Sequence, residues 1–584
     1  MSDQAVGTEA SKDDCNMRRY LFLACFVALV ATSFAFMIRV MVMDSWQIAF
    51  RLTETQKGEI FGAGLWPFGI SIVLFSLVLD KLGYGKSMIF AFACHVVSVL
   101  ILVTAKGYWG LYIGSVFNGL AAGIVEAVIN PAIATMYPKK KTTMLTVLHA
   151  GWSGGIVLAG LMIMLMSGMG LGSWKPQVGI ILVPVLAYGL MLLRCKFPVS
   201  ERVAAGVPYH DMLKEAGALG ALVVTFLITS EIGRVFGLPS LVVYGLILAQ
   251  AGAYFAYTRS FGRPMYVFLL LVMIILAITE LGTDAWIRDL MTPSMRRMGL
   301  DAGWVLIYTA TIMTILRFCI SPIEKALRPL GVLLVSALFA AVGLFFLSRV
   351  DGIMILVLAT IYGTGQCFFW PVTLGLVAEQ FPKGGALTLN AIAGVGMLGV
   401  GILGGPWLGY LQDTRIDERL QDNQIVYQEV ISPEERLSVL GNYRALDGEK
   451  VNVINDKVAL FRQRQEARKA NPDLSEQELD RLLSEDRVYQ TLVRNAYEPL
   501  AGTGDIPDTA TMMEVLRQNN IFVSEAEYNR LRAIQDTLDQ VSTEAKQNAM
   551  ATVATLPLIM AGCYLGLIIY FKRKGGYTIV DLSA

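Results

Sequence analysis

Charged residues are scarce in this sequence. Only 16% of its 584 residues are Asp, Glu, Lys or Arg, whereas about a quarter are charged in an ordinary soluble domain. The mean hydropathy is +0.55, and many apolar runs reach the roughly 20 residues that cross a hydrocarbon core as a helix. The scarcity of charge excludes a soluble globular protein and indicates an all-α polytopic membrane protein.

Residues that bind metals or form disulfides are scarce as well. The chain has three widely separated histidines and seven cysteines, none of which lies in residues 413–548. The histidine spacing predicts no metal site, and the cysteine distribution excludes a disulfide framework for that segment. The sequence also lacks a phosphate-binding P-loop and a recognisable catalytic motif. We therefore expect no cofactor, no direct use of ATP and no enzyme activity.

The few charges are unevenly placed along the chain. Residues 413–548 hold 26 acidic and 17 basic side chains, a net charge of −9, and the rest of the chain has a net charge of +10. An acidic, hydrophilic insert therefore interrupts a basic membrane body. "SPEE" at 432–435, "SEQE" at 475–478 and "SEAE" at 524–527 are capping boxes that predict helices in this insert. The last helix is expected to continue into the final span, and gating, oligomer contact and partner docking all remain open as roles of the insert.

Fourteen apolar stretches have the length and composition of membrane-spanning helices. They are 19–42, 57–80, 87–105, 108–136, 142–168, 177–196, 215–232, 239–257, 264–287, 302–320, 328–348, 352–380, 386–411 and 549–571.

The connections between these spans predict the topology. Even-numbered connections such as "YPKKKTT" and "TRSFGRP" are basic, and odd-numbered ones mostly are not, although "MRRMG" at 295–299 is an exception. The positive-inside rule then places both tails, 1–18 and 572–584, in the cytoplasm. It places the 413–548 insert outside a cytoplasmic (plasma) membrane. The first apolar run is longer than the core of a signal peptide and is predicted to be an uncleaved first span.

The two ends of the membrane body repeat each other. Shifting the sequence so that Asp80-Lys81 falls on Glu324-Lys325 also places "YPK" at 137–139 on "FPK" at 381–383. No gap is needed across five consecutive spans, and the matches coincide with equivalent helix ends. The sequence therefore contains a duplicated helical bundle.

The repeat predicts the domain organisation. Two six-helix bundles are expected at 19–196 and at 264–412 with 549–571, and a linker with an extra two-helix hairpin joins them at 197–263. Parallel six-helix halves are typical of the major facilitator fold, in which the substrate site lies between the halves near the membrane midplane.

The connection after the second span, "LVLDKLGYGKS", resembles the loop signature of that superfamily, with Asp80 and Lys81 at its core. Its weaker repeat is "ISPIEKALRP", which contains Glu324. The resemblance implies a charged latch that closes the cytoplasmic side, so we expect Asp80, Lys81 and Glu324 to take part in gating. Helix caps in a charged turn are the alternative.

An acidic residue interrupts the fourth span. Gly119, Gly123, Glu126 and Asn130 occupy one stripe of this helix, and Pro131 can bend it just beyond. A charge at bilayer depth costs about 2.5–3.5 kcal/mol on insertion scales. The pattern indicates a helix that lines a polar cavity rather than one that faces lipid.

The stretch "VEAVINPAIATMYP" around Glu126 resembles the fucose–galactose–glucose proton symporter family of the major facilitator superfamily. The resemblance covers the first half, including "FRLTETQKGEI" at 50–60. It implies that Glu126 and Asn130 bind sugar and that Glu126 handles the coupling proton, with His149 near the sugar-contacting region. Alignment through "FRLTETQKGEI" puts the helix-1 aspartate of the family on Val40, which departs from the family pattern.

Arg39 lies beside Val40 and needs a partner at membrane depth. Glu126 is a candidate partner across the contact between the first and fourth spans. Such a pair would make Glu126 a structural counter-ion or a switch. A role of Glu126 in substrate or proton handling, with Arg39 at the substrate site, is the other hypothesis.

Further polar residues lie within the second-half spans. Gln366, Trp370 and Thr373 share a stripe, and Trp370 is the repeat mate of Glu126. A tryptophan suits a sugar because the C–H face of the sugar stacks on the ring, so Gln366 and Trp370 are predicted to bind substrate. Glu280 and Asp284, followed by Trp286, form an outer gate or mark a helix end in water. Arg317 contacts substrate or latches the second-half turn through Glu324.

Together these features predict a secondary active transporter that moves a small polar solute, a monosaccharide, by alternating access, with a proton as the candidate coupling ion. One alternative is an organic-anion carrier, in which Arg39 and Arg317 clamp a phosphate or carboxylate. Another is a transporter-like receptor or scaffold whose outer insert binds a partner protein or mediates oligomer contact. The lipid bilayer is an expected partner and nucleic acid is not.

Overall fold

The computed structural model describes residues 12–582 apart from short gaps. The gaps are 51, 53, 285–286, 288–290, 292–294, 296–297, 301–302, 351, 439–440, 474, 486–488, 491, 494–495, 498–508 and 520. The chain divides into two compact units. Met1–Pro406 with Met550–Ala584 form the membrane unit, and Trp407–Ala549 form the inserted unit.

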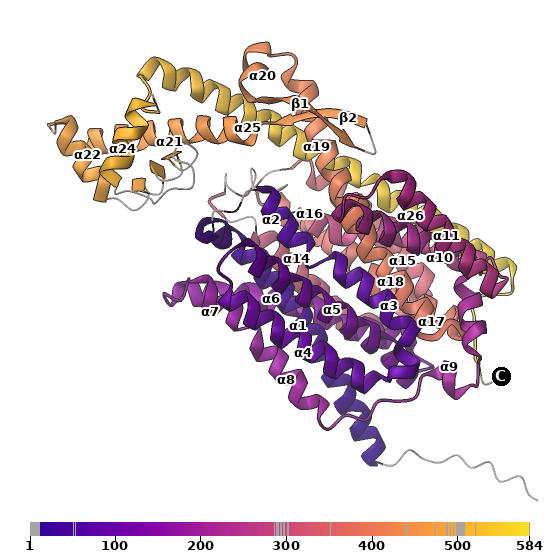
Figure 1. Ribbon diagram of the computed structural model, residues 1–584. Coiled ribbons are helices and arrows are strands. Elements are labelled where there is room, and N and C mark those ends of the chain that lie inside the picture. The colour runs from indigo at the N-terminus through magenta and orange to yellow at the C-terminus, as the bar shows by residue number, and fades with distance from the viewer. Residues whose placement is uncertain are drawn as a thin grey trace, which may run out of the picture. The chain divides into compact units, whose positions relative to one another are not determined.

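The membrane unit is built of helices that run alongside one another (Figure 1). In chain order these are α1 (Lys12–Phe50), α2 (Glu54–Gly62), α3 (Trp66–Leu82), α4 (Tyr84–Thr104), α5 (Tyr108–Met136), α6 (Lys141–Gly168), α7 (Trp174–Gly179), α8 (Leu182–Leu192), α9 (Glu201–Ala204), α10 (Tyr209–Val235), α11 (Ser240–Thr258), α12 (Pro264–Ala277), the π-helical turn η1 (Ile278–Gly282), α14 (Gly303–Phe318), α15 (Ile320–Leu347), α16 (Met354–Gln366), α17 (Phe369–Gln380), the 3₁₀ turn η2 (Pro382–Gly384), α18 (Gly385–Gly399), the π-helical turn η3 (Val400–Gly404) and α26 (Thr555–Arg573). Helix α19 (Gly405–Leu420) continues the chain into the inserted unit.

The helices confirm the predicted polytopic membrane fold. Within the described residues, thirteen helical segments are long and apolar enough to cross a membrane, and Gly303–Phe318 is a shorter apolar helix. Each of the fourteen spans expected from the sequence falls on one of these segments. Trp286 and the two arginines of "MRRMG" lie outside the described residues.

Glycines on α5 let it closely approach α3 and the turn that precedes α3. A Cβ atom at Gly119 would lie 2.6 Å from the carbonyl oxygen of Gly64, and one at Gly123 would lie 2.1 Å from Ser71 Oγ. Both distances are shorter than van der Waals contact, so a larger side chain would separate the helices. This packing holds the helix that carries Glu126 against its neighbour.

The two repeated connections break their helices in related ways. Gly83 ends α3 with φ 82° and ψ 149°, and Arg328 interrupts α15 with φ 57° and ψ 165°. Glycine adopts a positive φ at little steric cost, whereas at an arginine this conformation costs of order 1–3 kcal/mol. Pro329 follows Arg328 and cannot donate a helical hydrogen bond. The two halves therefore break their helices one repeat position apart, with different residues.

The inserted unit combines helices with one β-hairpin. Its helices after α19 are α20 (Gln424–Val430), α21 (Gly448–Ala470), α22 (Glu476–Glu485), α24 (Thr509–Gln518) and α25 (Glu525–Val553). The strands β1 (Ile431–Ser438) and β2 (Gly441–Leu446) pair antiparallel, with Ile431 opposite Leu446 and Ser438 opposite Gly441. Two apolar clusters form its core, one around Val458 and Leu531 and the other around Leu460 and Leu516.

The hairpin corrects one helix prediction. "SPEE" at 432–435 lies in β1 and does not cap a helix. Pro433 is compatible with the first turn of a helix and with an edge strand. Pairing with β2, which the local motif does not encode, favours the strand.

The other two capping boxes are confirmed. Ser475 Oγ accepts from the backbone N–H of Glu478 at 3.4 Å, and Glu478 accepts from the backbone N–H of Ser475 at 2.9 Å, directly before α22. Ser524 Oγ accepts from the backbone N–H of Glu527 at 3.3 Å at the start of α25. Only Ala554 separates the end of α25 from the start of α26, so the last helix continues almost without interruption.

Asp456 makes the stability of the inserted unit depend on pH. Burial on α21 raises the pKa of its carboxyl group to about 6. Because the folded pKa is raised, protonation stabilises the fold, and this contribution is lost as pH rises from about 4 through 6. Asp456→Asn should remove the dependence and protect α21 by about 1 kcal/mol at pH 7.

Hydrogen exchange of α21 in the full chain, measured between pH 4 and 7, tests this after correction for the intrinsic pH dependence of exchange. Asp473→Asn, at an exposed position, should retain the native pH profile. An unchanged profile in Asp456→Asn would contradict the assignment.

Candidate functional site

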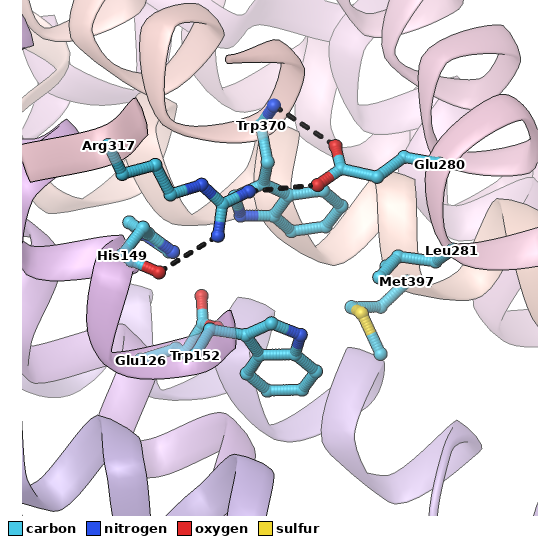
Figure 2. Close-up of a pocket in the computed structure, with 8 residues that line it drawn as sticks. All are labelled: Glu126, His149, Trp152, Glu280, Leu281, Arg317, Trp370 and Met397. Atoms are coloured by element: carbon cyan, nitrogen blue, oxygen red, sulfur yellow. Dashed lines mark hydrogen bonds and ion pairs between the residues drawn. The ribbon is translucent and has the colours of Figure 1, made fainter. Parts of the chain in front are cut away.

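The two halves of the membrane unit line a cavity of about 290 Å³, here called the central cavity. Figure 2 shows its lining residues. The first half contributes Glu126 from α5 and His149 and Trp152 from α6, and the second half contributes Glu280, Leu281, Arg317, Trp370 and Met397. Five residues singled out from the sequence, Glu126, His149, Glu280, Arg317 and Trp370, therefore meet at one site.

Glu126 belongs to a short hydrogen-bonded chain in the first half. Its side chain is 3% exposed, and its Oε2 accepts from Asn130 Nδ2, one helical turn away, at 3.2 Å. Asn130 Oδ1 in turn accepts from His149 Nε2 at 3.1 Å. The i, i+4 spacing of Glu126 and Asn130 on α5 allows this contact, and it also orients His149 at the cavity wall.

Arg317 is the most fully engaged group of the site. Its Nη2 donates to Glu280 Oε1 at 3.1 Å, Nη1 to the carbonyl oxygen of His149 at 2.8 Å, and Nε to that of Cys367 at 2.7 Å. The first contact is an ion pair in which both side chains are almost fully buried. Figure 2 shows Arg317 between His149 and Glu280. One guanidinium thereby joins the first half to the second.

A break in a transmembrane helix supplies the polar backbone groups around this pair. Helix α16 ends at Gln366 and α17 begins at Phe369. The first N–H groups of a helix and its last carbonyls have no intrahelical partner. The N–H of Trp370, in the first turn of α17, donates to Glu280 Oε2 at 3.2 Å, and the carbonyl of Cys367, just after α16, accepts from Arg317.

The break is electrostatically matched to the ion pair. The N-terminus of α17 carries a partial positive charge and faces a carboxylate, whereas the C-terminus of α16 carries a partial negative charge and faces a guanidinium. Glu280 itself lies in η1, and π-helical turns occur frequently at functional sites. A broken helix at membrane depth is tolerated where it lines a cavity.

Glu280 and Asp284 have separate positions. Glu280 is 2% exposed and paired, so the hypothesis that it marks a helix end in water is wrong. Asp284 Oδ1 accepts from Gln366 Nε2 at 3.1 Å, and Asp284 lines a neighbouring cavity. Gln366 thus touches the site through Asp284 and is absent from the lining of the central cavity.

The neighbouring cavity, here called the apolar cavity, has a volume of about 560 Å³. It shares Trp152, Leu281 and Met397 with the central cavity. Its other lining residues are Phe36, Phe61, Leu65, Ile156, Asp284, Leu306 and Val400. Sequence analysis missed these apolar residues because nothing in the sequence distinguishes them from residues that face lipid. Trp152 could have been found from its position three residues after His149.

Arg39 does not pair with Glu126, which corrects one hypothesis. Its Nη1 donates to Asn118 Oδ1 at 3.1 Å, and its guanidinium packs against Gly64. Asn118 lies eight residues before Glu126 on α5, which corresponds to roughly 12 Å along the helix axis. Arg39 is therefore two helical turns from the carboxylate and does not line either cavity.

Glu324 does not pair with Arg317, which corrects a second hypothesis. It accepts from Thr143 Oγ1, a residue of the first half at the start of α6. Arg317 is already satisfied by Glu280 and two carbonyl groups. The contact of Glu324 still joins the two halves, although through a different partner.

The loop signature forms a charged cluster. Asp80 pairs with Arg202 of α9 at 2.5 Å and accepts from Ser200 Oγ at 2.9 Å. Lys81 is exposed, with its Nζ 5.8 Å from the centre of the Tyr209 ring. Asp80 thus has a buried basic partner and Lys81 remains at the surface.

The start of α6 makes further contacts across the halves on the same side of the bundle. Thr142 Oγ1 donates to Glu379 Oε1 at 2.6 Å, and Lys141 Nζ donates to the carbonyl of Ala378 at 3.2 Å. Tyr577 of the C-terminal tail donates to Glu379 Oε2 at 2.6 Å. These contacts, which sequence analysis missed, join the two halves and the C-terminal tail on the side of the even-numbered connections. The acid at position 379, two residues before the repeated "FPK", is the signal that could have indicated them.

Comparison with known proteins identifies the family. The model of the Major Facilitator Superfamily matches residues 21–406, which is more than half of the chain. A search of curated proteins found no match.

Solved structures share the fold at low sequence identity. The E. coli fucose:proton symporter FucP is 16% identical with a TM-score of 0.50, and the match covers 68% of this chain and 92% of that one. The proton:xylose symporter XylE, bound to 6-bromo-6-deoxy-D-glucose, is 14% identical with a TM-score of 0.50, covering 71% and 91%. The human organic anion transporter TETRAN is 13% identical with a TM-score of 0.48, covering 67% and 92%. The chain belongs to the Major Facilitator Superfamily of membrane transporters and shares the fold of the fucose and xylose proton symporters.

Proposed function

We propose that this transporter carries a monosaccharide or a closely related small polar solute by alternating access, coupled to a proton. The observation that carries the proposal is the central cavity, where Glu126 of the first half and Trp370 of the second line one space between the halves. This is where a transporter built of two parallel halves binds its substrate. The sugar specificity of FucP and XylE, as their names give it, agrees with this choice.

The lining chemistry suits a sugar. Trp152 and Trp370 present two indole rings to the cavity, and aromatic rings pack against the C–H faces of sugars. Trp370 Nε1 is buried and has no acceptor among the described residues. A sugar hydroxyl would satisfy this donor, and the carboxyl group of Glu126 and the His149 ring would take further hydroxyl contacts. We assign Asn130 and Gln366 as positioning residues, since they hold Glu126 and Asp284.

The cavity is contracted in this conformation. Side chains from both halves reach into it, and Arg317 of the second half donates across it to the carbonyl of His149 in the first. Contacts between the halves through Glu324 and Glu379 close the side of the even-numbered connections. Positive-inside reasoning makes that side cytoplasmic, with both tails in the cytoplasm and the 413–548 insert outside. We therefore assign Asp80, Lys81, Glu324 and Glu379 to a cytoplasmic gate.

The charges of the site support proton coupling. Arg317 compensates Glu280, whereas the described partner of Glu126 is the neutral amide of Asn130. An uncompensated carboxylate is costly in a site of low dielectric constant, and binding a proton removes that cost. Glu126 is therefore the residue that we assign to carry the proton between the two sides.

The hydrogen-bonded chain provides the link between proton binding and movement of the halves. Glu126 contacts Asn130, Asn130 contacts His149, and the carbonyl of His149 accepts from Arg317. Arg317 continues the chain to Glu280 in the second half. A change in charge or occupancy at Glu126 would thus act on a contact that joins the halves. The contact would then differ in free energy between the protonated and the deprotonated form of Glu126.

The geometry does not favour the organic-anion alternative. Arg317 uses Nε, Nη1 and Nη2 on protein acceptors, and Arg39 lies outside both cavities. An anion clamp would need these guanidinium groups to face the same space. Measuring flux in liposomes distinguishes a receptor or scaffold from a transporter, because only a transporter would move the solute.

Glu126→Gln should uncouple transport from the proton gradient. The test uses a sugar that the native protein accumulates in proteoliposomes under an inward proton gradient. Its accumulation should fall by about tenfold or more, because the variant cannot bind and release a proton at position 126. Exchange of labelled for unlabelled sugar should persist and lose its pH dependence. Glu418→Gln, an exposed position on α19, is the control. Proton-driven accumulation that survives in Glu126→Gln would contradict the assignment.

Replacing one partner of the Glu280–Arg317 pair should destabilise the protein more than replacing both. Glu280→Gln or Arg317→Gln alone should each cost about 3–5 kcal/mol, because a buried charge loses its partner. The double variant should be more stable than the less stable of the two single variants. Thermal unfolding in one detergent at fixed pH measures this, and additive losses would refute a buried pair.

Arg39→Gln should separate the sugar and anion hypotheses. Because Arg39 does not line the cavity, affinity for a neutral sugar should change by less than about threefold. Isothermal titration of the folded variant with a neutral monosaccharide that binds the native protein, and with a monophosphate of the same monosaccharide, measures this. Selective loss of phosphate binding would support an anion site instead.

A further inference from the structure

The apolar cavity directly adjoins the central cavity. Trp152, Leu281 and Met397 form part of the wall of both. At about 560 Å³ against about 290 Å³, the apolar cavity is the larger of the two. A solute bound beside Glu126 would therefore lie next to a second space, with Trp152, Leu281 and Met397 at the boundary.

The lining of the second cavity differs in chemistry from that of the first. Nine of its ten lining residues are apolar, and Asp284 is the exception. The Asp284 carboxylate is held by Gln366 Nε2 at 3.1 Å. The central cavity, in contrast, is lined by two carboxylates, a guanidinium and an imidazole, together with Trp152, Leu281, Trp370 and Met397. Four of the five ionisable side chains that line the two cavities thus face the central one.

Aromatic rings connect the two spaces. The ring centre of Phe36 lies 6.0 Å from that of Trp152 and 6.1 Å from that of Phe61. These distances fall within the range of about 4.5–7 Å for aromatic pairs in contact. The rings form a continuous apolar wall that begins at the polar site.

We propose that the natural solute is amphipathic, with a sugar head in the central cavity and an alkyl or aryl group in the apolar cavity. This inference rests on the proposed sugar-transport function and names the substrate class as a glycoside. A free sugar would fill only the polar space and leave the apolar wall in contact with water. An attached apolar group removes that surface from water, which favours binding in proportion to the area buried.

Trp152 has a central position in this arrangement. It belongs to both linings, so its ring can contact the sugar and the first atoms of the apolar group. The linkage between the two parts of the solute would then lie beside Trp152, Leu281 and Met397. The geometry points to a glycosidic oxygen at that boundary.

Binding of matched glycosides to the purified full chain tests the proposal. The probes are the methyl and hexyl glycosides of D-glucose, D-galactose and L-fucose, with dissociation constants measured by isothermal titration below the critical micelle concentration of each hexyl compound. For the sugar that binds, the hexyl form should bind about tenfold or more tightly than the methyl form, because five additional methylene groups become buried.

Variants of the apolar wall test where the hexyl group lies. Phe61→Ala should reduce the ratio of hexyl to methyl affinity by about fivefold, and Leu65→Trp should reduce it by filling the space. Phe75→Ala is the matched control, because Phe75 stacks on Phe90 and lines neither cavity; it should keep the native ratio. If one variant fails to fold, the other still tests the location.

The outcomes distinguish this inference from the function on which it rests. Equal affinities for methyl and hexyl glycosides, or a ratio that neither wall variant changes, would overturn the amphipathic solute and leave sugar transport intact. Hexanol binding as tightly as a hexyl glycoside would overturn it too, because no sugar head would be needed. Absence of binding by every glycoside would refute the sugar assignment and this inference together.

Discussion

The arrangement of the membrane unit depends on the buried guanidinium of Arg317. Its contacts with Glu280, the carbonyl of His149 and the carbonyl of Cys367 bring together η1, α6 and the break between α16 and α17. A buried charge is tolerated only when its hydrogen-bonding groups and its charge are both satisfied. The broken helix meets this requirement, because its free carbonyl faces Arg317 and its free N–H faces Glu280. The first turn of α17 also contributes Trp370 to the lining of the central cavity.

This constraint explains why the buried polar groups and the central cavity coincide at the interface of the halves. The polar groups that would be costly in lipid are satisfied around a space that both halves line. On the side of the even-numbered connections, Thr142 with Glu379 and Thr143 with Glu324 add contacts that cross the same interface. Asn390 with the carbonyl of Ala127 and Thr314 with Ser153 also join the halves among the described residues.

Much of the fold and part of the site could be predicted from the sequence. Hydrophobic length located the spans, and the repeat placed Trp370 opposite Glu126, because duplicated helices occupy equivalent positions in the two halves. Helical periodicity correctly put Asn130 one turn from Glu126. The partners of Arg39 and Glu324 could not be predicted in this way. Their choice depends on how far neighbouring helices are displaced along their axes, and composition and spacing carry no measure of that displacement.

The sequence by itself determined which segments enter the membrane and which acids lie within them, because the cost of placing polar groups in hydrocarbon acts on each segment locally. Tertiary structure alone decided that "SPEE" at 432–435 forms a strand, since its pairing partner lies in β2. It also decided that Phe36, Phe61 and Leu306 face a cavity and not lipid. Both environments accept the same apolar side chains, so only the packing of helices that are distant in sequence distinguishes them.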